Sequence, residues 1–225
     1  MKREELLAFL VEEVVERKEK GRPLKVGVDG RCASGKSVLA DELAPALRRR
    51  GLDVLRPSVD GFHYPRDHRH RQGEYSASGY YEDAFNYRAV EDYLLQPLSQ
   101  HSFPVLCRQV AHDVRTDMPI SAPPVSVEAH TVLLFDGVFL FRPELNAYWD
   151  FRILLDIDAA TSVSRAVERD AIDPPDVVRR KYGERYEPAW QIYVAKERPA
   201  FKADVIVDNR DFLHPQILKP ERSAL

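Results

Sequence analysis

Four residues at a fixed spacing carry the clearest chemistry in this sequence. Gly30, Gly35, Lys36 and Ser37 follow the pattern G-x-x-x-x-G-K-S, which is typical of loops that bind nucleotide phosphates. Such a loop aims several backbone N–H groups at one polyphosphate, and its glycines permit an approach that a Cβ atom would obstruct. Lys36 would then reach the β- and γ-phosphates, and the hydroxyl of Ser37 would bind Mg²⁺. The alternative is a glycine-containing turn between a strand and a helix, with a lysine at the surface.

The segments around this motif decide between the two interpretations. An apolar run at residues 24–28 predicts a strand before the loop, and residues 38–44 predict a helix after it, which is the context that phosphate binding requires. Four further apolar runs predict strands, at residues 52–59, 132–137, 151–156 and 203–207. Helical patterns separate several of these strands, so we expect an α/β fold with a five-stranded, mostly parallel sheet.

Two carboxylates follow predicted strands directly. Asp60 comes after the second strand, and Asp136 ends the continuous apolar run that begins at Val132. In open α/β sheets, ligands bind beyond the carboxyl ends of the strands, so both acids are candidates for the site. An Asp in the position of Asp136 helps to hold Mg²⁺ in P-loop enzymes. For Asp60 the alternative is a turn with Gly61, and the pattern alone leaves both interpretations open.

The rest of the chain predicts a lid and an insertion. Residues 1–22 contain an amphipathic helix over residues 4–19, and residues 23–225 form one domain. Short apolar runs at 103–108 and 125–131 predict a β-hairpin insertion over about 101–130. Its polar residues, which include His112 and Arg115, either contact a substrate or form a solvated face. Helical segments over about 165–190 carry several arginines.

Composition excludes several functional classes. The formal net charge is −3, which gives no basic excess for nucleic acid, although the basic run at residues 66–71 is suited to smaller anions. The two cysteines are too few for a disulfide framework. The first residues contain acids that a signal peptide would lack, and no apolar run is long enough to cross a membrane. We therefore expect a cytoplasmic protein without a membrane or nucleic-acid partner. Self-association through the first helix or the hairpin is left open.

Several segments of the chain together resemble one branch of the P-loop kinases, the uridine kinase and phosphoribulokinase-like family. Besides the loop at 30–37, the matching segments in order are Ser-Val-Asp-Gly-Phe-His at 58–63, Asp-Ala-Phe at 83–85, Leu-Phe-Asp-Gly at 134–137, Ser-Arg-Ala-Val-Glu-Arg-Asp at 164–170 and Ala-Asp-Val-Ile-Val-Asp-Asn at 203–209. The resemblance implies the three-layer sandwich of P-loop NTPases, with a helical lid and a small β-hairpin insertion.

The resemblance also implies an activity, namely transfer of the γ-phosphoryl group of ATP to a hydroxyl of a nucleoside-like acceptor, with Mg²⁺. The catalytic residues that it implies are Asp60, which receives the proton of the hydroxyl, Lys36 and the lid residue Arg169. The implied nucleotide site comprises Gly30, Arg31, Ala33, Ser34, Gly35, Lys36, Ser37, Val38, Asp208 and Asn209. The implied acceptor site comprises Asp60, His63, Tyr64, Asp83, His112, Arg115 and Arg165, with Asp83 on the ribose hydroxyls. Ser37 and Asp136 are the implied metal ligands.

Two segments of the sequence differ from the family pattern, and both bear on the identity of the acceptor. Uridine kinases have a Tyr-Asp-x-x-x-His-like pattern in the hairpin, whereas residues 107–115 read Cys-Arg-Gln-Val-Ala-His-Asp-Val-Arg. The Arg-Gly-Arg element of the family's lid is replaced by Asp-Pro-Pro-Asp at 173–176. Pantothenate, a sugar, a sugar phosphate and nicotinamide riboside therefore stay open as acceptors. A nucleotide-dependent regulatory module that hydrolyses ATP slowly is the alternative from another functional class.

Overall fold

Six strands form one central sheet in the computed structural model, which describes residues 1–218. The strands are β1 (Leu24–Gly30), β2 (Val54–Leu55), β7 (Val132–Gly137), β8 (Phe151–Asp156), β9 (Val205–Asp208) and β10 (Gln216–Leu218), in the order β10-β9-β8-β1-β7-β2. All neighbouring pairs are parallel except β10, which runs antiparallel to β9 at the sheet edge. The α/β class is thus confirmed, but the expected count of five strands is wrong. The sixth strand was missed because it is a three-residue edge strand at the surface with no apolar run to indicate it.

The second strand is also shorter than predicted. Residues 52–59 were expected to be extended, but β2 contains only Val54 and Leu55, and the chain then turns into a 3₁₀ helix, η1 (Val59–Phe62). Pro57 has no N–H group to donate to a neighbouring strand, and beyond it Ser58 forms only a single bridge to Asp136 of β7. Asp60, which was predicted to follow the strand directly, lies on η1.

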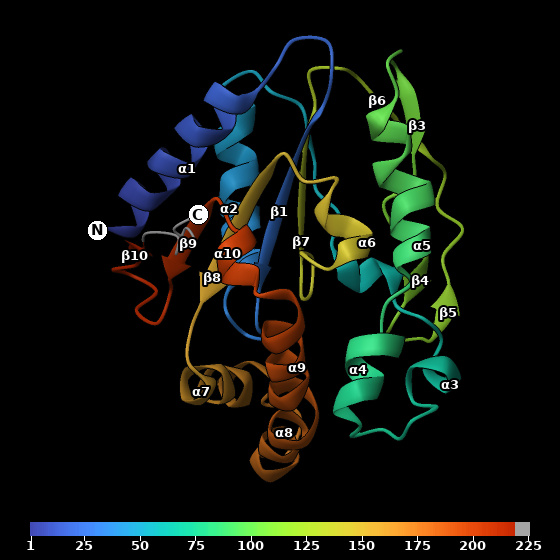
Figure 1. The fold of residues 1–225 in the computed structure, drawn as a ribbon, viewed down its shortest axis with the longest axis vertical. Helices are drawn as coiled ribbons and strands as arrows, with labels where there is room; N and C mark the ends of the chain where they lie inside the picture. The colour runs from blue at the N-terminus through green and yellow to red at the C-terminus, as the bar shows by residue number, and fades with distance from the viewer. Residues whose placement is uncertain (219–225) are drawn as a thin grey trace.

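Alternating side chains of the sheet divide the interior into two cores. Val132 and Leu134 of β7 pack with α1 (Arg3–Arg17) and α2 (Lys36–Arg49), whereas Leu133 and Phe135 face the opposite core. From α1, Leu6, Leu10 and Val14 are fully buried, and each buried side chain of this size contributes about 1.5–3 kcal/mol. The N-terminal helix is therefore part of the core on the same face as α2, as Figure 1 shows.

The opposite face is covered by helical segments from the middle and the end of the chain. They are α4 (Ala77–Asp83), α5 (Tyr87–Val90), the π-helical turn η2 (Glu91–Leu95), the 3₁₀ turn η3 (Pro97–Ser99), α6 (Pro143–Asn146), α9 (Glu187–Glu197) and α10 (Pro199–Lys202). Phe139 and Tyr193 meet edge to face in this core, with ring centroids 5.2 Å apart. Helices on both faces of the sheet give the three layers that the sequence predicted.

Two small antiparallel sheets lie in the segment expected to form a hairpin. The first pairs β3 (Val105–Cys107) with β6 (Val125–Val127), and the second pairs β4 (His112–Asp113) with β5 (Met118–Pro119). Figure 1 shows these strands beside α5, away from the lid helices.

The lid segments gather beyond the carboxyl ends of the parallel strands. They are α7 (Ala159–Arg169), α8 (Pro175–Lys181) and the π-helical turn η4 (Tyr182–Tyr186), which leads into α9. Ala166, Val178 and Tyr182 form a small core of their own between these segments. Figure 1 shows α3 (Arg66–Arg69) and α4 at the same end of the molecule. Over residues 1–218, no helix is both long and apolar enough to span a bilayer.

Candidate active site

The loop between β1 and α2 has the backbone geometry that its glycines require. Gly35 has φ 93°, in the left-handed region, and a Cβ atom there would lie 2.8 Å from the amide nitrogen Nδ2 of Asn209. That nitrogen donates a hydrogen bond to the backbone oxygen of Ser34 at 2.7 Å. Asn209, which follows β9, therefore holds the loop from the side. Immediately after Gly35, α2 begins, so the free N–H groups of its first turn adjoin the loop and favour an anion.

Lys36 lies folded over the loop. Its Nζ donates to the backbone oxygen of Arg31 at 2.8 Å, and the residue also lines the large cavity described below. This position keeps a positive charge beside the N-terminus of α2, where the phosphates of a nucleotide would lie.

Ser37 and Asp136 meet at the edge of the same cavity. Ser37 Oγ donates to Asp136 Oδ2 at 2.6 Å, and the other carboxylate oxygen accepts from Arg56 at 2.7 Å. A hydroxyl and a carboxylate are hard oxygen donors, and Mg²⁺ commonly takes one or two protein ligands together with phosphates and waters. The pair therefore fits Mg²⁺. In the described part of the chain there is no group of three or more His, Cys, Asp or Glu residues that would suit a metal held by protein alone.

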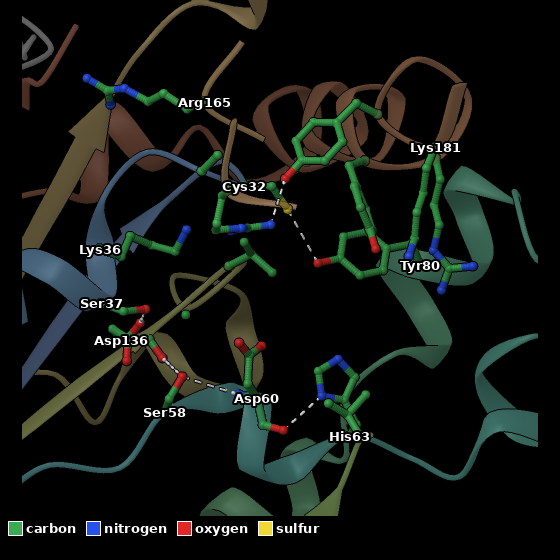
Figure 2. Close-up of a pocket in the computed structure, with 18 of the residues that line it drawn as sticks. Cys32, Lys36, Ser37, Ser58, Asp60, His63, Tyr80, Asp136, Arg165 and Lys181 are labelled. Atoms are coloured by element: carbon green, nitrogen blue, oxygen red, sulfur yellow. Dashed lines mark hydrogen bonds between the residues drawn. The ribbon is translucent and has the colours of Figure 1, made fainter. Parts of the chain in front are cut away.

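Asp60 projects toward the pair from η1. Ser58 links them, since its Oγ donates to the backbone oxygen of Asp136 at 3.2 Å and accepts from the N–H of Asp60 at 3.3 Å. Figure 2 shows the carboxylate of Asp60 directed into the cavity, on the side opposite its backbone contact with His63. The Nδ1 atom of His63 lies 2.9 Å from the backbone oxygen of Asp60. A carboxylate, a lysine and a metal-type pair thus face one space.

That space is a cavity of about 780 Å³. Ten residues of the predicted site line it: Ala33, Gly35, Lys36, Ser37, Val38, Asp60, His63, Asp136, Arg165 and Arg169. A cavity of this volume is within the range of small-molecule sites. It combines the loop, the carboxyl ends of β2 and β7, and the lid.

Five other residues assigned to the nucleotide site support the loop without lining the cavity: Gly30, Arg31, Ser34, Asp208 and Asn209. Arg31 forms a bidentate pair with Glu187 of α9, with both distances 2.8 Å. Asp208 pairs with Arg210 at 2.6 Å. Gly30 approaches β8 so closely that a Cβ atom would lie 2.5 Å from the backbone oxygen of Leu155.

Four residues assigned to the acceptor site do not line the cavity: Tyr64, Asp83, His112 and Arg115. The carboxylate of Asp83 is buried against Arg71 and Gln72, and the amide of Gln72 donates to it at 2.7 Å. His112 is buried with its Nε2 atom 3.1 Å from Asp117. Arg115 is exposed on the hairpin segment. Their roles as acceptor contacts stay predictions.

Many residues that line the cavity were not predicted from the sequence. They are Cys32, Ser58, Arg66, Arg69, His70, Glu74, Tyr80, Val114, Gly137, Val138, Lys181, Tyr182, Arg185, Tyr186 and Phe212. Arg56, beside Asp136, was also missed, although it directly follows β2 and thus obeys the same strand-end rule as Asp60. The basic run at 66–71 was a second signal. No local pattern indicated that Tyr80 and Tyr186 would meet, with centroids 4.7 Å apart.

Asp29 is a buried carboxylate directly beneath the loop. It accepts hydrogen bonds from the N–H of Gly30 at 2.7 Å, the N–H of Leu140 at 3.1 Å and the hydroxyl of Tyr193. Burial raises the pKa of Asp29 to about 6, against the opposing effect of these hydrogen bonds. Nearby, burial also raises the pKa of the Cys32 thiol, whose Sγ lies 3.6 Å from the Tyr80 hydroxyl. The thiol is therefore held in its neutral form, consistent with a small packing side chain.

In sequence and fold, the chain is similar to known kinases. No protein-family model matches the chain. The chain is 28% identical over 191 residues to uridine-cytidine kinase B of Dictyostelium discoideum, covering 82% of this chain and 74% of that protein. It superposes on a possible uridine kinase from Bacillus stearothermophilus with a TM-score of 0.67 and 25% identity, over 89% and 96% of the two chains. A protein of Silicibacter sp. TM1040 named for a fructose transport system kinase gives a TM-score of 0.64 and 28% identity, over 83% and 93%.

Proposed function

We infer from the homology of this chain to uridine kinases, and from its P-loop kinase fold, that it transfers the γ-phosphoryl group of ATP to a hydroxyl of a small polar acceptor. One observation supports this above all others. The carboxylate of Asp60 enters the same cavity as Lys36, Ser37 and Asp136. A module that only binds and slowly hydrolyses ATP has no need for a second carboxylate facing an acceptor space.

The loop side of the cavity would bind the triphosphate. The first N–H groups of α2 and the ammonium group of Lys36 would hold the phosphate oxygens. Ser37 and Asp136 would hold Mg²⁺, which when bound neutralises charge on the β- and γ-phosphates. Arg56 would fix the orientation of Asp136, because it donates to that carboxylate at 2.7 Å and to the backbone oxygen of Ser37 at 3.2 Å.

Asp60 would orient the acceptor hydroxyl and receive its proton. In a loose transition state the nucleophile needs little activation, so correct placement contributes most of the effect. Asp60 is well suited to this role because Ser58 and His63 fix its backbone on either side of the carboxylate.

The lid would complete the site. Arg165 and Arg169 of α7 and Lys181 of α8 line the cavity, opposite the strands. Closure of these segments over both substrates would add positive charge near the transferring group and exclude water. Nucleosides and sugars are both acceptors to test, since the proteins to which the chain is similar are named for uridine, cytidine and fructose.

The test is ATP consumption in the presence of single acceptors, with substitutions on each side of the cavity. The acceptors are nucleosides, pantothenate, sugars, sugar phosphates and nicotinamide riboside. With the accepted compound, Lys36→Ala should abolish transfer. Asp60→Asn should lower kcat by roughly 10²–10⁴-fold and leave the affinity for a non-hydrolysable ATP analogue unchanged. Asp67→Asn, at an exposed position on α3 outside the cavity lining, is the matched control.

Two results would count against this function. Full transfer activity in Asp60→Asn would remove the role given to this carboxylate. If no acceptor raised ATP consumption above the rate with water alone, a nucleotide-dependent regulatory module would be the better description.

A further inference from the structure

The end of the cavity away from the phosphate-binding loop is strongly basic. Arg66, Arg69 and His70 reach it from α3 and the residue that follows, and Arg185 reaches it from η4. We name these four residues the α3–η4 cluster. Figure 2 shows the two ends of the cavity, with Lys36 and Ser37 on one side and Tyr80 and Lys181 on the other. The ring of Tyr80 lies between the loop and the cluster, because its hydroxyl contacts Cys32 and the Arg185 guanidinium lies 5.1 Å from its centroid.

Two members of the cluster are buried cations with incomplete compensation. Arg185 is 4% exposed and Arg69 is 8% exposed. Arg185 donates to the backbone oxygen of Glu74, and within residues 1–218 it forms no ion pair. Arg69 shares one carboxylate, Asp117, with His112. The Nε atoms of both arginines have no hydrogen-bond partner in the described structure. Burying guanidinium groups without matching anions is costly, which indicates that an anion belongs beside them.

The members of the cluster act on one another although they come from separate segments. Burial and the positive charges of Arg185, Arg69 and Arg66 lower the pKa of His70, against the effect of Glu74. Burial and the charge of Arg69 also lower the pKa of His63, whose ring contacts the backbone of Asp60. The cluster lines the same cavity as His63, which contacts the backbone of Asp60, so it faces the space in which the acceptor would lie.

We propose that the α3–η4 cluster binds an oxyanion group, phosphate or carboxylate, of the phosphoryl acceptor. The acceptor class is then a hydroxyl compound that already carries a negative charge, such as a sugar phosphate or a hydroxy acid, instead of a neutral nucleoside. This inference rests on the proposed function, in which Asp60 receives the proton of the acceptor hydroxyl. Guanidinium groups suit such acceptors, because their N–H donors match the oxygens of a phosphate or carboxylate.

Binding of small anions to the nucleotide-loaded protein tests the proposal directly. The protein is saturated with Mg²⁺ and a non-hydrolysable ATP analogue, which occupies the loop, and is then titrated calorimetrically with inorganic phosphate or with acetate at constant ionic strength. We expect one of the two anions to bind at one site, and the one that binds distinguishes a phosphate from a carboxylate acceptor. Arg69→Gln and Arg185→Gln should each weaken this binding at least tenfold and leave affinity for the analogue within twofold.

Two further variants separate the cluster from general effects of charge and folding. Arg66→Gln alters an exposed member of the cluster, so the fold should tolerate it, and it should weaken anion binding about threefold. Arg88→Gln removes an arginine of α5 that is 74% exposed and paired with Asp92, and it should change nothing. The proposal would be overturned if neither anion bound the analogue complex. It would also be overturned if all three cluster variants bound the anion as tightly as the wild type does. Failure of the analogue itself to bind would instead overturn the proposed function, and this inference with it.

Turnover gives a second readout. Neutral and anionic acceptors are compared in matched pairs, for example a sugar with its phosphate and a polyol with the corresponding hydroxy acid. The anionic member should have the higher kcat/KM by at least 100-fold, and Arg69→Gln and Arg185→Gln should remove that preference mainly by raising KM. A higher kcat/KM for the neutral member of every pair would contradict the inference.

Discussion

Asp29 shows what a single buried residue does beneath the phosphate-binding loop. Its ordinary pKa is 3.8, and burial raises it to about 6, so as pH rises the unfolded chain loses this proton before the folded protein does. The carboxyl therefore lowers stability progressively between about pH 4 and pH 6, and the loss stays constant above that range. Relative to Asp29→Asn, the wild type should lose about 1.3 kcal/mol of unfolding free energy between pH 5 and pH 7. Urea unfolding of both proteins at pH 5 and pH 7 measures these free energies. If the difference in unfolding free energy between the wild type and Asp29→Asn were the same at both pH values, the prediction would be wrong.

Individual residues were predictable where a motif or a strand end marks them. Lys36 and Ser37 follow from the loop spacing, and Asp60 and Asp136 follow from their places after strands; all four line the cavity. Asp29 could not be found this way, because segments distant along the chain enclose it: the hydroxyl that donates to it belongs to Tyr193, 164 residues away, and burial is what raises its pKa. The same is true of Arg185, whose place depends on the packing of η4 against α4, a helix distant along the chain.

The lid elements are tied to the loop by specific contacts. Glu187, at the start of α9, holds Arg31 through two hydrogen bonds of 2.8 Å, and Ser162 of α7 donates to the backbone oxygen of Cys32 at 2.7 Å. The sequence predicted helical segments over about residues 165–190, and the end of α7, all of α8 and η4, and the start of α9 lie in that range. These contacts were not predictable, because they join segments more than a hundred residues apart.

Breaking one of these contacts should weaken nucleotide binding without removing any phosphate ligand. Glu187→Gln should loosen the loop around Arg31, and reordering about one residue on binding costs roughly 1–2 kcal/mol. We therefore expect the affinity for a non-hydrolysable ATP analogue to fall about fivefold to tenfold, measured by calorimetry. Glu184→Gln is the matched control, because Glu184 lies less than one turn away and, among residues 1–218, pairs only with exposed Arg180. Equal affinities in the two variants would show that the Arg31–Glu187 pair does not order the loop.

At the scale of the whole molecule, side-chain contacts link the N-terminal helix to the phosphate-binding loop. Arg3 of α1 donates to Asn209 at 3.2 Å, and Asn209 in turn holds the loop at Ser34. The sequence predicted the helix itself, from the spacing of Leu6, Leu10 and Val14. The place of α1 against α2 was not readable from an amphipathic pattern, since such a pattern shows which face is buried but not what covers it.

This arrangement predicts that a cavity made under α1 will lower the stability of the core on the opposite face of the sheet as well. Leu10 is fully buried in the core beneath α1 and α2, whereas Trp149 packs in the opposite core, stacked on Phe135 with centroids 5.7 Å apart. Strands β7, β8 and β9 contribute side chains to both cores, so Leu10→Ala should destabilise the protein by about 3 kcal/mol in one transition. Tryptophan fluorescence and far-UV circular dichroism should then give the same urea midpoint. Leu7→Ala, at a half-buried position one residue past Leu6, should cost clearly less. If the dichroism of α1 were lost at a lower urea concentration than the tryptophan signal, the helix would be a separate unit and the site would not depend on it.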